Sequence, residues 1–326
     1  MLRCIQRSET DPYYNLGAEE YLMKTATVDT FMIWRNEPSV IIGKHQNASR
    51  EINHVYTESH KLPVIRRITG GGAVYHDLGN INFSFIYPDR KENLVDFRYF
   101  TKPIILFLSE LGLNAAFEGK NNIIVDGLKV SGNSAHIFKN KVLHHGTLLF
   151  HTDLVALGQA VNGNAEYYSD KSVRSVPAIV GNASSFLGER LSIEEFMGKF
   201  TSFILKYPGS YYGELTSDEK ESIIKLTKLK YKKIEWNFGY SPDYLYNTSW
   251  KMDNEAFAIS LIVSKGVIQK AEISGTLRYS LFFKTLSDQL IGVYHEKNSV
   301  SEILEKVTFA DEVERESLNQ IIMHIF

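Results

Sequence analysis

The chain has 326 residues, 44% hydrophobic and 23% charged, and a net charge of −2. This composition is typical of a globular protein long enough for two domains, with no basic excess for nonspecific nucleic-acid binding. The apolar run 256–263, interrupted only by Ser260, is too short to cross a bilayer. Cys4 is the only cysteine, so an intrachain disulfide is excluded and a reducing compartment fits best. We therefore expect a cytoplasmic protein without nucleic-acid or membrane partners.

In chain order, the first predicted element is a helix that begins at Asp11-Pro12, because aspartate favours the N-cap and proline the first helical position. Strands are predicted at 31–34, 39–43, 64–67 and 80–87. Between Asn80 and Tyr87, apolar and polar residues alternate, which predicts a strand with one apolar and one polar face.

Further elements are a helix at 103–111, a hairpin around Asp126-Gly127, a strand at 142–150 and helices between 192 and 229. The stretch 237–247, rich in Gly, Pro, Ser and Asn, indicates a domain boundary. After it come a predicted hairpin around 264–266 and helices at 281–292, 299–307 and 311–325. We expect an α+β fold, with mixed β-sheets flanked by helices in a domain at 1–240 and a small α+β domain at 247–326.

The most unusual stretch is R-R-I-T-G-G-G-A-V-Y-H-D-L-G-N, from Arg66 to Asn80. Consecutive glycines lose entropy on folding and add no packing, so they indicate a tight turn or a ligand against the main chain. The motif has neither the Gly-Lys-Ser/Thr ending of a P-loop nor the G-x-G-x-x-G spacing of a dinucleotide fold. Arg66 and Arg67 point to opposite faces of a strand, so one can be buried while the other faces the glycines. This favours an anionic ligand, and a purely structural glycine-rich hairpin is the alternative.

Lys129 lies in a second group, 118–135, ahead of the small polar residues S-G-N-S. Val130 takes the opposite face of the predicted strand, which allows Lys129 to point inward. An inward lysine can act as a point charge against a phosphate or a developing oxyanion. An ordinary surface lysine is the alternative.

His144 and His145 are adjacent on a predicted strand, so they face opposite sides and make a poor chelate for one metal. With one cysteine and no H-x-x-x-H pattern, a zinc site is not expected. We expect one histidine to face the site and the other to be structural. His76-Asp77 does not indicate a Ser-His-Asp triad, because no G-x-S-x-G elbow supplies a nucleophile.

The Arg66–Asn80 motif, K-V-S-G-N-S-A at 129–135 and H-H-G-T-L-L at 144–149 together resemble the lipoate–protein ligase A family in order and spacing. Stretches at 34–47, 171–176 and 235–239 are similar to the same family. The resemblance covers nearly the whole chain, and the tail is similar to the accessory domain of the long-form ligases. It implies the catalytic fold of the biotin and lipoate ligases, which by itself does not decide function.

The resemblance implies an ATP-dependent reaction in which lipoate becomes lipoyl-AMP and the lipoyl group then passes to an acceptor lysine. The implied cofactors are ATP and Mg²⁺, the metal held through phosphates without an assigned protein ligand. The implied partners are lipoyl domains of 2-oxoacid dehydrogenase E2 subunits and the glycine cleavage H protein. Lys129 matches the catalytic lysine. Residues implied to bind ATP or lipoyl-AMP are Arg67, Gly72, Ala73, Val74, Tyr75, Asn80, Asn121 and Lys129. Residues implied to bind lipoate are Arg67, His76, Lys129 and His145.

One departure from the family concerns Gly119-Lys120-Asn121-Asn122, where Gly-Arg-Asn-Asp is frequent. Asn122 lacks the charge that an aspartate offers to a metal, and Lys120 lacks the bidentate fork of arginine. This leaves open a lipoyl or octanoyl transferase that uses a preformed acyl donor without ATP. Cys4 lies outside every motif, which disfavours a transferase with a cysteine nucleophile. A non-enzymatic nucleotide or lipoate binder is disfavoured by Lys129 and the intact first motif.

Overall fold

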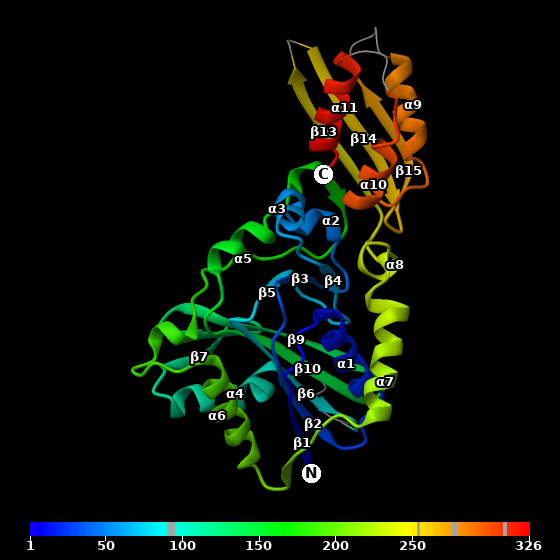
Figure 1. Ribbon diagram of the computed structural model, residues 1–326. Helices are drawn as coiled ribbons and strands as arrows, with labels where there is room; N and C mark the ends of the chain where they lie inside the picture. Colours follow the sequence, from blue (N-terminus) through cyan, green and yellow to red (C-terminus); the bar gives the residue numbers. More distant parts are fainter. Residues whose placement is uncertain (90–94, 253–254, 276–279, 309–311) are drawn as a thin grey trace.

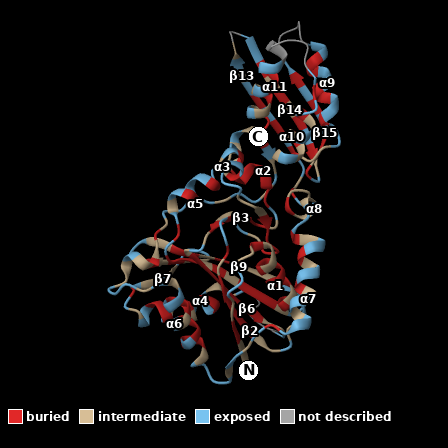
Figure 2. Cartoon of the chain, viewed as in Figure 1, coloured by how far each residue is buried: buried red, intermediate tan, exposed pale blue. Residues whose placement is uncertain are grey.

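The computed structural model describes residues 1–89, 95–252, 255–275, 280–308 and 312–326. Figure 1 shows a large part that holds the N-terminus and a smaller part at the other end of the molecule that holds the C-terminus. Figure 2 shows buried residues along the strands of both parts, while much of the outer surface of the helices is exposed. No helix of the described chain combines the length and the apolar character that a membrane span requires.

The main sheet organises the large part. Within the described residues it has eight strands, in the order β12 (Ser210–Tyr212), β1 (Leu2–Gln6), β2 (Asp29–Trp34), β6 (Asn80–Tyr87), β10 (Lys141–Leu149), β9 (Leu128–Phe138), β8 (Asn122–Val125) and β7 (Ala115–Glu118). β1 runs parallel to β12 and β2, and the other neighbours are antiparallel. The predicted Asp126-Gly127 turn between β8 and β9 is confirmed, with φ angles of 45° and 82°.

Helices cover both faces of the main sheet. On one face lie α4 (Phe97–Glu110) and α6 (Ile193–Leu205), where the rings of Phe107 and Phe200 stack with centroids 4.6 Å apart. On the other face lie α1 (Pro12–Thr25) and α7 (Ser217–Leu226). β6 is buried on both sides for this reason, and its polar residue Ser84 donates a hydrogen bond to Glu19 of α1. The alternation in β6 was predicted correctly, but its polar face lines the interior.

The starts of α1 and α4 show how capping decides a helix boundary. α1 begins as predicted, with the Asp11 carboxylate accepting backbone hydrogen bonds of 2.8 and 3.3 Å and Pro12 in the first turn. The helix predicted at 103–111 begins earlier, because Asp96 caps it and accepts a backbone hydrogen bond of 3.0 Å. Pro103 therefore lies inside α4, and the predicted start was wrong. The proline removes one backbone hydrogen bond, which the cap and the buried apolar face of α4 offset.

The segment from 192 to 229 contains α6 and α7, as predicted, but β12 separates them. β12 has three residues and only extends the edge of the main sheet, so no alternating pattern marks it in the sequence. A single π-helical turn, Thr227–Tyr231, continues α7 and leads to α8 (Ile234–Asn237).

A small sheet carries the glycine motif. Its strands are β4 (Val64–Arg66), β3 (Ser39–Ile42) and β5 (Val74–His76), with β3 in the centre. β4 is parallel to β3 and β5 is antiparallel to it, so the glycines leave the sheet on one side of β3 and return on the other. They are therefore not the turn of a two-stranded hairpin. α2 (Ala48–Glu51), α3 (His54–Ser59) and α5 (Leu154–Ala160) cover this sheet.

The smaller part has its own antiparallel sheet, made of β13 (Tyr244–Met252), β14 (Glu255–Ser264) and β15 (Val267–Ser274). The predicted helices are confirmed as α9 (Ser280–Leu290), α10 (Lys297–Leu304) and α11 (Glu312–His324), and residue 311 lies outside the described residues. The predicted turn at 264–266 is confirmed, with φ angles of 50° and 75° at Lys265 and Gly266. From the middle of the chain, β11 (Tyr168–Asp170) joins this sheet as an antiparallel neighbour of β13.

Phe326 and two histidines fill the junction between the two parts. The Phe326 ring lies 4.6 Å from the His54 ring and 5.0 Å from the His295 ring. The Tyr244 hydroxyl and His295 Nδ1 are hydrogen-bonded at 2.7 Å, and His295 Nε2–H donates to the Ile325 carbonyl at 2.7 Å. Both imidazoles are buried in this junction, and burial lowers the pKa of His54 to about 3 and of His295 to about 4.

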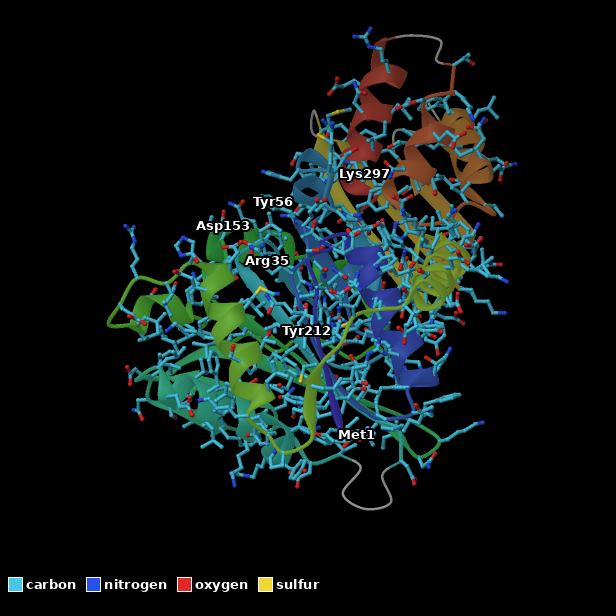
Figure 3. All side chains as sticks on the ribbon, turned by 60° about the horizontal axis from the view of Figure 1, so that its bottom comes forward. Met1, Arg35, Tyr56, Asp153, Tyr212 and Lys297 are labelled. Carbon is cyan, nitrogen blue, oxygen red and sulfur yellow. The ribbon has the colours of Figure 1, made fainter. Side chains whose placement is uncertain are left out.

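Charged contacts surround this apolar junction. Lys297 at the start of α10 forms an ion pair with Glu58 of α3, and Figure 3 labels Lys297 together with Tyr56 of the same α3 helix. Inside the junction, Arg50 of α2 and Asp170 of β11 form a buried ion pair of 3.2 Å. These contacts link α3 to α10 and α2 to β11 of the smaller part's sheet.

The buried histidines predict a pH-dependent stability. Burial lowers the pKa of His54, His76 and His144 to about 3 and of His295 to about 4, so all four are neutral in the folded protein. The unfolded chain takes up these protons below the ordinary value of 6.5. The contribution of these histidines to the free energy of unfolding is therefore fully present above that value. It is lost as the pH falls, by about 1.4 kcal/mol per pH unit for each histidine.

We expect a lower Tm at pH 5 than at pH 7. His144→Phe removes one titrating ring and keeps the stacking on Phe100, whose centroid is 4.8 Å away, so the pH dependence of Tm should become shallower. His151→Asn, at an exposed position, is the control. An unchanged pH slope in His144→Phe would contradict this assignment.

Candidate functional site

A cavity of about 790 Å³ lies between the glycine loop, 70–74, and the strands β9 and β10. Its walls also include 120–122, at the start of β8, and the segment 173–178. The cavity brings together Arg67, Gly72, Ala73, Val74, His76, Asn121, Lys129 and His145 from the predicted site. A second cavity, of about 740 Å³, lies around Phe150 and 184–193 and contains none of the predicted site residues.

Tyr75 and Asn80 were also predicted as site residues, but neither lines the main cavity. Tyr75 is 5% exposed and packs among the apolar residues under the small sheet. Asn80 is fully buried, and its side chain donates to Asn82 Oδ1 at 3.0 Å. Asn82 does line the cavity, although the sequence did not single it out.

Arg67 shapes the glycine loop from within. Its guanidinium donates to four oxygen atoms: Thr69 Oγ1 at 3.0 Å and the carbonyls of Ile41 at 3.1 Å, Gly70 at 2.6 Å and Gly72 at 2.8 Å. Since an arginine has five N–H groups, at most one remains for a ligand. Burial lowers the pKa of Arg67 to about 10, and no carboxylate contacts it directly among the described residues. Arg67 therefore binds mainly the loop and its neighbours, and has at most one N–H group for a ligand.

The glycines are needed for different reasons at different positions. Gly71 has a φ of +90°, which favours glycine. A Cβ on Gly43, in the strand end beneath the loop, would lie 2.0 Å from the Gly71 carbonyl oxygen, so the loop can lie here only against a glycine. Around Gly70, by contrast, a Cβ would meet nothing within 4 Å. The open side of Gly70 faces space that a ligand can use.

Arg66 takes the opposite direction, as the strand geometry predicts, and is fully buried. Its guanidinium donates to carbonyl and hydroxyl oxygens on either side: Gly43 at 3.0 Å, Lys44 at 3.1 Å, Gln46 at 2.7 Å, Asn237 at 2.8 Å and Ser241 Oγ at 2.9 Å. Burial lowers the pKa of Arg66 to about 9. Arg66 thus fixes the segment below the glycine loop to the chain that leads into the smaller part.

Lys129 lines the cavity without a partner among the described residues, as do Lys120 and Arg174 in the same wall. It follows the β8–β9 turn. Its backbone is bonded to the chain at 179–181, where Lys129 N–H donates to Ile179 O at 3.0 Å and Gly181 N–H donates to Lys129 O at 3.0 Å. No hydrogen bond or ion pair joins Lys129 Nζ to any other described residue. Burial lowers its pKa, and an anion nearby would favour its charged form again. The expectation of an inward lysine is therefore met by the geometry.

Asn121 and Asn122 lie beside Lys129 in the cavity wall. The Asn121 side chain donates to the Asn133 carbonyl, and Asn133 Nδ2–H donates back to the Asn121 carbonyl at 3.0 Å. This pair fixes the start of β8 against β9. Asn122 contributes a neutral amide to the wall, where an aspartate would contribute a charge.

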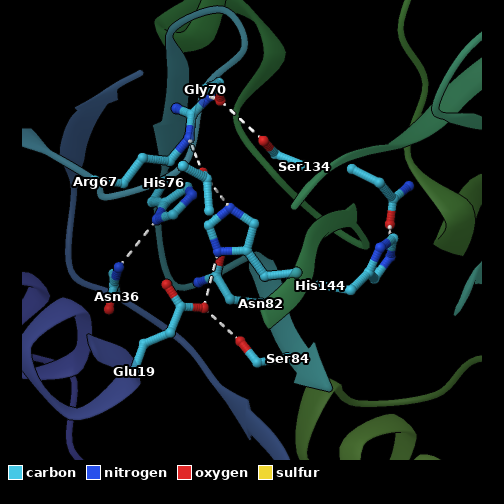
Figure 4. A network of polar contacts seen from close by, with 12 residues as sticks. Glu19, Asn36, Arg67, Gly70, His76, Asn82, Ser84, Ser134 and His144 are labelled. Atoms are coloured by element: carbon cyan, nitrogen blue, oxygen red, sulfur yellow. Dashed lines mark hydrogen bonds and ion pairs between the residues drawn. The ribbon is translucent and has the colours of Figure 1, made fainter. Parts of the chain in front are cut away.

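Figure 4 shows a chain of hydrogen bonds beneath the glycine loop. His145 Nε2 lies 2.7 Å from Thr69 Oγ1, and His145 Nδ1 lies 2.8 Å from Glu19 Oε1. The Ser84 hydroxyl donates to the same Glu19 oxygen. His144 points the other way and stacks on Phe100, so the prediction of one histidine at the site and one structural histidine agrees with the geometry.

Glu19 did not emerge from the motifs, although a weak signal exists. It follows Leu16 by three residues and precedes Met23 by four, which places a carboxylate on the apolar face of α1. Its side chain is 1% exposed. A charged residue at such a position indicates a buried polar partner.

His76 faces the cavity in its neutral form. Its Nδ1 accepts a hydrogen bond of 2.9 Å from Asn36 Nδ2, and no described residue bonds to its Nε2. Burial, and then the charge of Arg67, lowers the pKa of His76 to about 3. The Asp77 carboxylate accepts from the backbone N–H groups of Gly79 and Asp153 at 2.9 and 2.8 Å instead of from His76. His76 and Asp77 are therefore not joined by a hydrogen bond, although they are adjacent in the sequence.

The segment 171–180 covers the glycine loop through Ser175, which the sequence did not indicate as a contact. Ala73 N–H donates to Ser175 Oγ at 2.9 Å, and Gln46 Nε2 donates to the same oxygen at 3.1 Å. Glu51 accepts from the Ser175 backbone N–H at 3.1 Å. A ligand that uses the Ala73 N–H must therefore first displace Ser175.

Metal ligands are scarce at the cavity. Among the described residues, no group of three or more His, Cys, Asp or Glu side chains is arranged to hold a metal ion. The described wall of the cavity contains no carboxylate side chain. Hard cations such as Mg²⁺ prefer carboxylate, phosphate and water oxygens, so the protein groups alone do not make such a site.

Comparisons with known proteins identify the family to which the chain belongs. Residues 11–204 match the family described as the lipoyl protein ligase A/B catalytic domain, and residues 241–325 match the bacterial lipoate protein ligase C-terminus. Lipoate–protein ligase 1 of Staphylococcus aureus is 37% identical over 297 residues, 90% of each chain. A lipoate-protein ligase of Bacillus subtilis is 34% identical over 314 residues, 94% of each chain.

Solved structures share the fold. A putative lipoate protein ligase from T. acidophilum with bound lipoic acid has a TM-score of 0.63 and 26% identity, over 73% of this chain and 99% of that chain. The crystal structure of lipoate-protein ligase A bound with ATP has a TM-score of 0.61 and 26% identity, over 74% of this chain and 100% of that chain. The predicted α+β class and the resemblance are both confirmed. This chain is a member of the lipoate–protein ligase family, a family of enzymes.

Proposed function

We propose that this chain is an ATP-dependent lipoate–protein ligase, which forms lipoyl-AMP from lipoate and ATP and then transfers the lipoyl group to an acceptor lysine. The observation that carries the proposal is the cavity in which unpaired Lys129 shares a wall with the glycine loop and with apolar side chains. An ammonium, exposed main chain and an apolar wall match the phosphate, the nucleotide and the aliphatic part of lipoyl-AMP. The relatives solved with ATP and with lipoic acid support the same pair of ligands.

In the first reaction, an oxygen of the lipoate carboxylate attacks the α-phosphorus of ATP. The bond from that phosphorus to the bridging oxygen breaks, and pyrophosphate leaves with the electron pair. Negative charge accumulates on the phosphoryl oxygens in the transition state. The Lys129 ammonium is suited to neutralise it, because charge interactions are stronger in a partly buried site than in water.

In the second reaction, the neutral amine of the acceptor lysine attacks the acyl carbonyl of lipoyl-AMP. The amide bond forms, the bond between the acyl carbon and the phosphate oxygen breaks, and AMP leaves as the amine loses a proton. Lys129 can again face the developing oxyanion and the departing phosphate. No covalent enzyme intermediate is needed, and Cys4 lies fully buried in the core under α4 and α6.

The aliphatic chain of lipoate needs an apolar wall. Leu16, Trp34, Ile41 and Val74 supply one in the cavity. Each is contributed by a different element, so the wall depends on how α1, β2, β3 and β5 pack together. Covering by the segment 173–178 would protect the reactive anhydride from water.

We propose MgATP as the nucleotide substrate, with phosphate and water oxygens supplying most of the Mg²⁺ coordination. The absence of a carboxylate in the described wall supports this arrangement. No protein residue is assigned as a metal ligand.

We propose lipoyl domains as acceptors, specifically those of 2-oxoacid dehydrogenase E2 subunits and the glycine cleavage H protein. An archaeal relative of 25% identity and TM-score 0.63 was solved as a bi-partite lipoate protein ligase and its E2 lipoyl domain, which supports the first of these. We propose the cytoplasm as the compartment, to which the free and buried thiol of Cys4 is suited. We also propose domains at 1–240 and 247–326, with β11 contributed by the first to the sheet of the second.

One observation favours a second candidate, a lipoyl or octanoyl transferase that uses a preformed acyl donor without ATP. Asn122 stands where the family often has an aspartate, so the wall beside Lys129 carries less negative charge for a metal–nucleotide complex. The second reaction needs no pyrophosphate site and would be unaffected. The two candidates differ only in the first reaction.

We therefore expect lipoate-dependent exchange of labelled pyrophosphate into ATP when the purified full chain is given Mg²⁺. Exchange that requires lipoate would establish adenylation and show that Asn122 is tolerated. Transfer from synthetic lipoyl-AMP to a lipoyl domain, without any exchange, would instead identify the transferase. A protein that shows no exchange and no transfer would overturn both candidates.

Lys129→Met should lower the exchange rate by about 10²–10³-fold, because it removes the charge and keeps the aliphatic stem. Gly132→Ala provides a milder test, since its Cβ would lie 3.2 Å from Lys129 Cε and 3.3 Å from Nζ and would displace the ammonium without removing it. We expect Gly132→Ala to lose less activity than Lys129→Met, and Lys228→Met, at an exposed position, to lose none. Exchange by Lys129→Met at the wild-type rate would refute the role of Lys129.

Two glycine variants separate the loop's own packing from ligand contact. Gly43→Ala should lower the Tm and raise the KM for both substrates, because the new Cβ would lie 2.0 Å from Gly71 O. Gly70→Ala has free space around it, so its Tm should match the wild type while its KM rises through contact with the ligand. A normal KM in Gly70→Ala would mean that the ligand does not lie along this side of the loop.

A further inference from the structure

We propose that Glu19 is a positioning residue that holds the glycine loop in its ligand-binding shape through His145, Thr69 and Arg67. The proposal rests on the proposed function, because the loop is taken as the ligand site. Neither Glu19 nor Thr69 belongs to the described wall of the cavity. Any effect of these two residues on the ligand must therefore pass through the residues between them and the loop.

The directions of the hydrogen bonds follow from the chemistry of the groups. Arg67 has no acceptor, so its Nε–H donates to Thr69 Oγ1 at 3.0 Å. We assign the single hydroxyl proton of Thr69 to the contact with His145 Nε2, 2.7 Å away, so that this nitrogen accepts. A neutral imidazole that accepts at Nε2 carries its proton on Nδ1. That proton is donated to Glu19 Oε1 at 2.8 Å.

We call the series of hydrogen bonds from Arg67 through Thr69 and His145 to Glu19 the relay. In this assignment every donor lies on the loop side of its acceptor. On the loop side, the same guanidinium holds the carbonyls of Gly70 at 2.6 Å and Gly72 at 2.8 Å. Ser134 Oγ also donates to Gly70 O, at 2.9 Å. The position of the Arg67 side chain thus decides where the glycine carbonyls lie. Glu19 decides the tautomer of His145, and with it which atom Thr69 can bond.

The charge of Glu19 also has a distant partner. No ion pair joins Glu19 to a lysine or arginine among the described residues, and its Oε2 has no described hydrogen-bond partner. Burying such a carboxylate is unfavourable unless an opposite charge offsets the loss of hydration. The buried guanidinium of Arg67 is that charge, since Glu19 opposes the effect of burial on the pKa of Arg67. The relay links a buried anion to a buried cation without direct contact between them.

Glu20, the next residue, provides the matched comparison. It is buried like Glu19 but faces the π-helical turn. Its carboxylate binds Lys24 at 2.6 Å, Lys230 at 2.7 Å and the Tyr231 hydroxyl at 2.6 Å. Glu20 therefore anchors α1 to the rest of the fold, and Glu19 alone faces the loop.

The first experiment compares Glu19→Gln with Glu20→Gln in the full chain. Glu19→Gln keeps the size of the side chain and weakens the pull on the Nδ1 proton, so the KM for lipoate in the exchange assay should rise about tenfold, as expected for loss of a charged hydrogen bond. Glu20→Gln should lower the Tm and leave the KM unchanged. A Glu19→Gln variant that loses only thermal stability would overturn the proposal.

The second experiment breaks the relay in the middle. Thr69→Val has nearly the same shape but no hydroxyl, whereas Thr69→Ser restores the hydroxyl. We expect Thr69→Val to raise the KM for lipoate as Glu19→Gln does, and Thr69→Ser to restore it to within about threefold of the wild type, the usual range of a small packing change. Equal KM values for Thr69→Val and the wild type would show that these hydrogen bonds do not position the glycine loop for the ligand.

A third readout does not depend on activity. Nitrogen-15 NMR of the imidazole, assigned with His145→Asn, reports which nitrogen carries the proton. We expect His145 to be protonated on Nδ1 in the wild type and in Glu20→Gln, and to lose this preference in Glu19→Ala. A protein without lipoate-dependent exchange would refute the proposed function while leaving this test intact. Protonation on Nε2 in the wild type would refute the relay itself.

Discussion

Two guanidinium groups are buried back to back at the base of the glycine loop, and each is satisfied by main-chain carbonyls instead of by direct contact with a carboxylate. A buried cation is tolerated only if nearly all of its N–H groups are bonded. Arg67 therefore requires the loop to turn its carbonyls inward, and Arg66 requires the segments around Gly43 and Asn237 to do the same. Since the carbonyls point inward, the outer side of the loop offers its open glycine surface to the cavity.

This constraint connects distant parts of the chain. Arg66 binds the end of α8, which leads to β13, while Ser175 of the covering segment binds Ala73 of the loop. The covering segment begins at β11, whose residue Asp170 pairs with Arg50 and accepts from Asn47 at 3.1 Å. The cavity, its cover and the sheet of the smaller part are thus joined by polar contacts between buried and partly buried groups.

The sequence was sufficient for the features that local chemistry determines. The three glycines, the inward Lys129 and the opposite directions of His144 and His145 follow from strand periodicity and from glycine's lack of a Cβ. The start of α4 was mispredicted at Pro103, because proline favours the first turn of a helix. The helix instead begins after its cap, Asp96, and continues through the proline. Ser175 and β11 could not be found, because their partners lie far along the chain and leave no local pattern. Glu19 left only the weak signal of a carboxylate on the apolar face of α1, and its partner His145 is also far along the chain.

The position of β11 has a consequence for how the protein acquires its structure. During synthesis, β11 leaves the ribosome well before β13, the strand that it pairs with. Until β13 follows, β11 has no strand to pair with, and the segment after it is held only by contacts with the large part, such as Asp170 with Arg50 and Ser175 with Ala73. Pairing with β13 therefore adds the last of the contacts that hold the start of this cover. A nascent chain with an unfinished C-terminal sheet would thus have a less firmly held cover over its glycine loop, and would be less suited to retain a water-sensitive acyl adenylate.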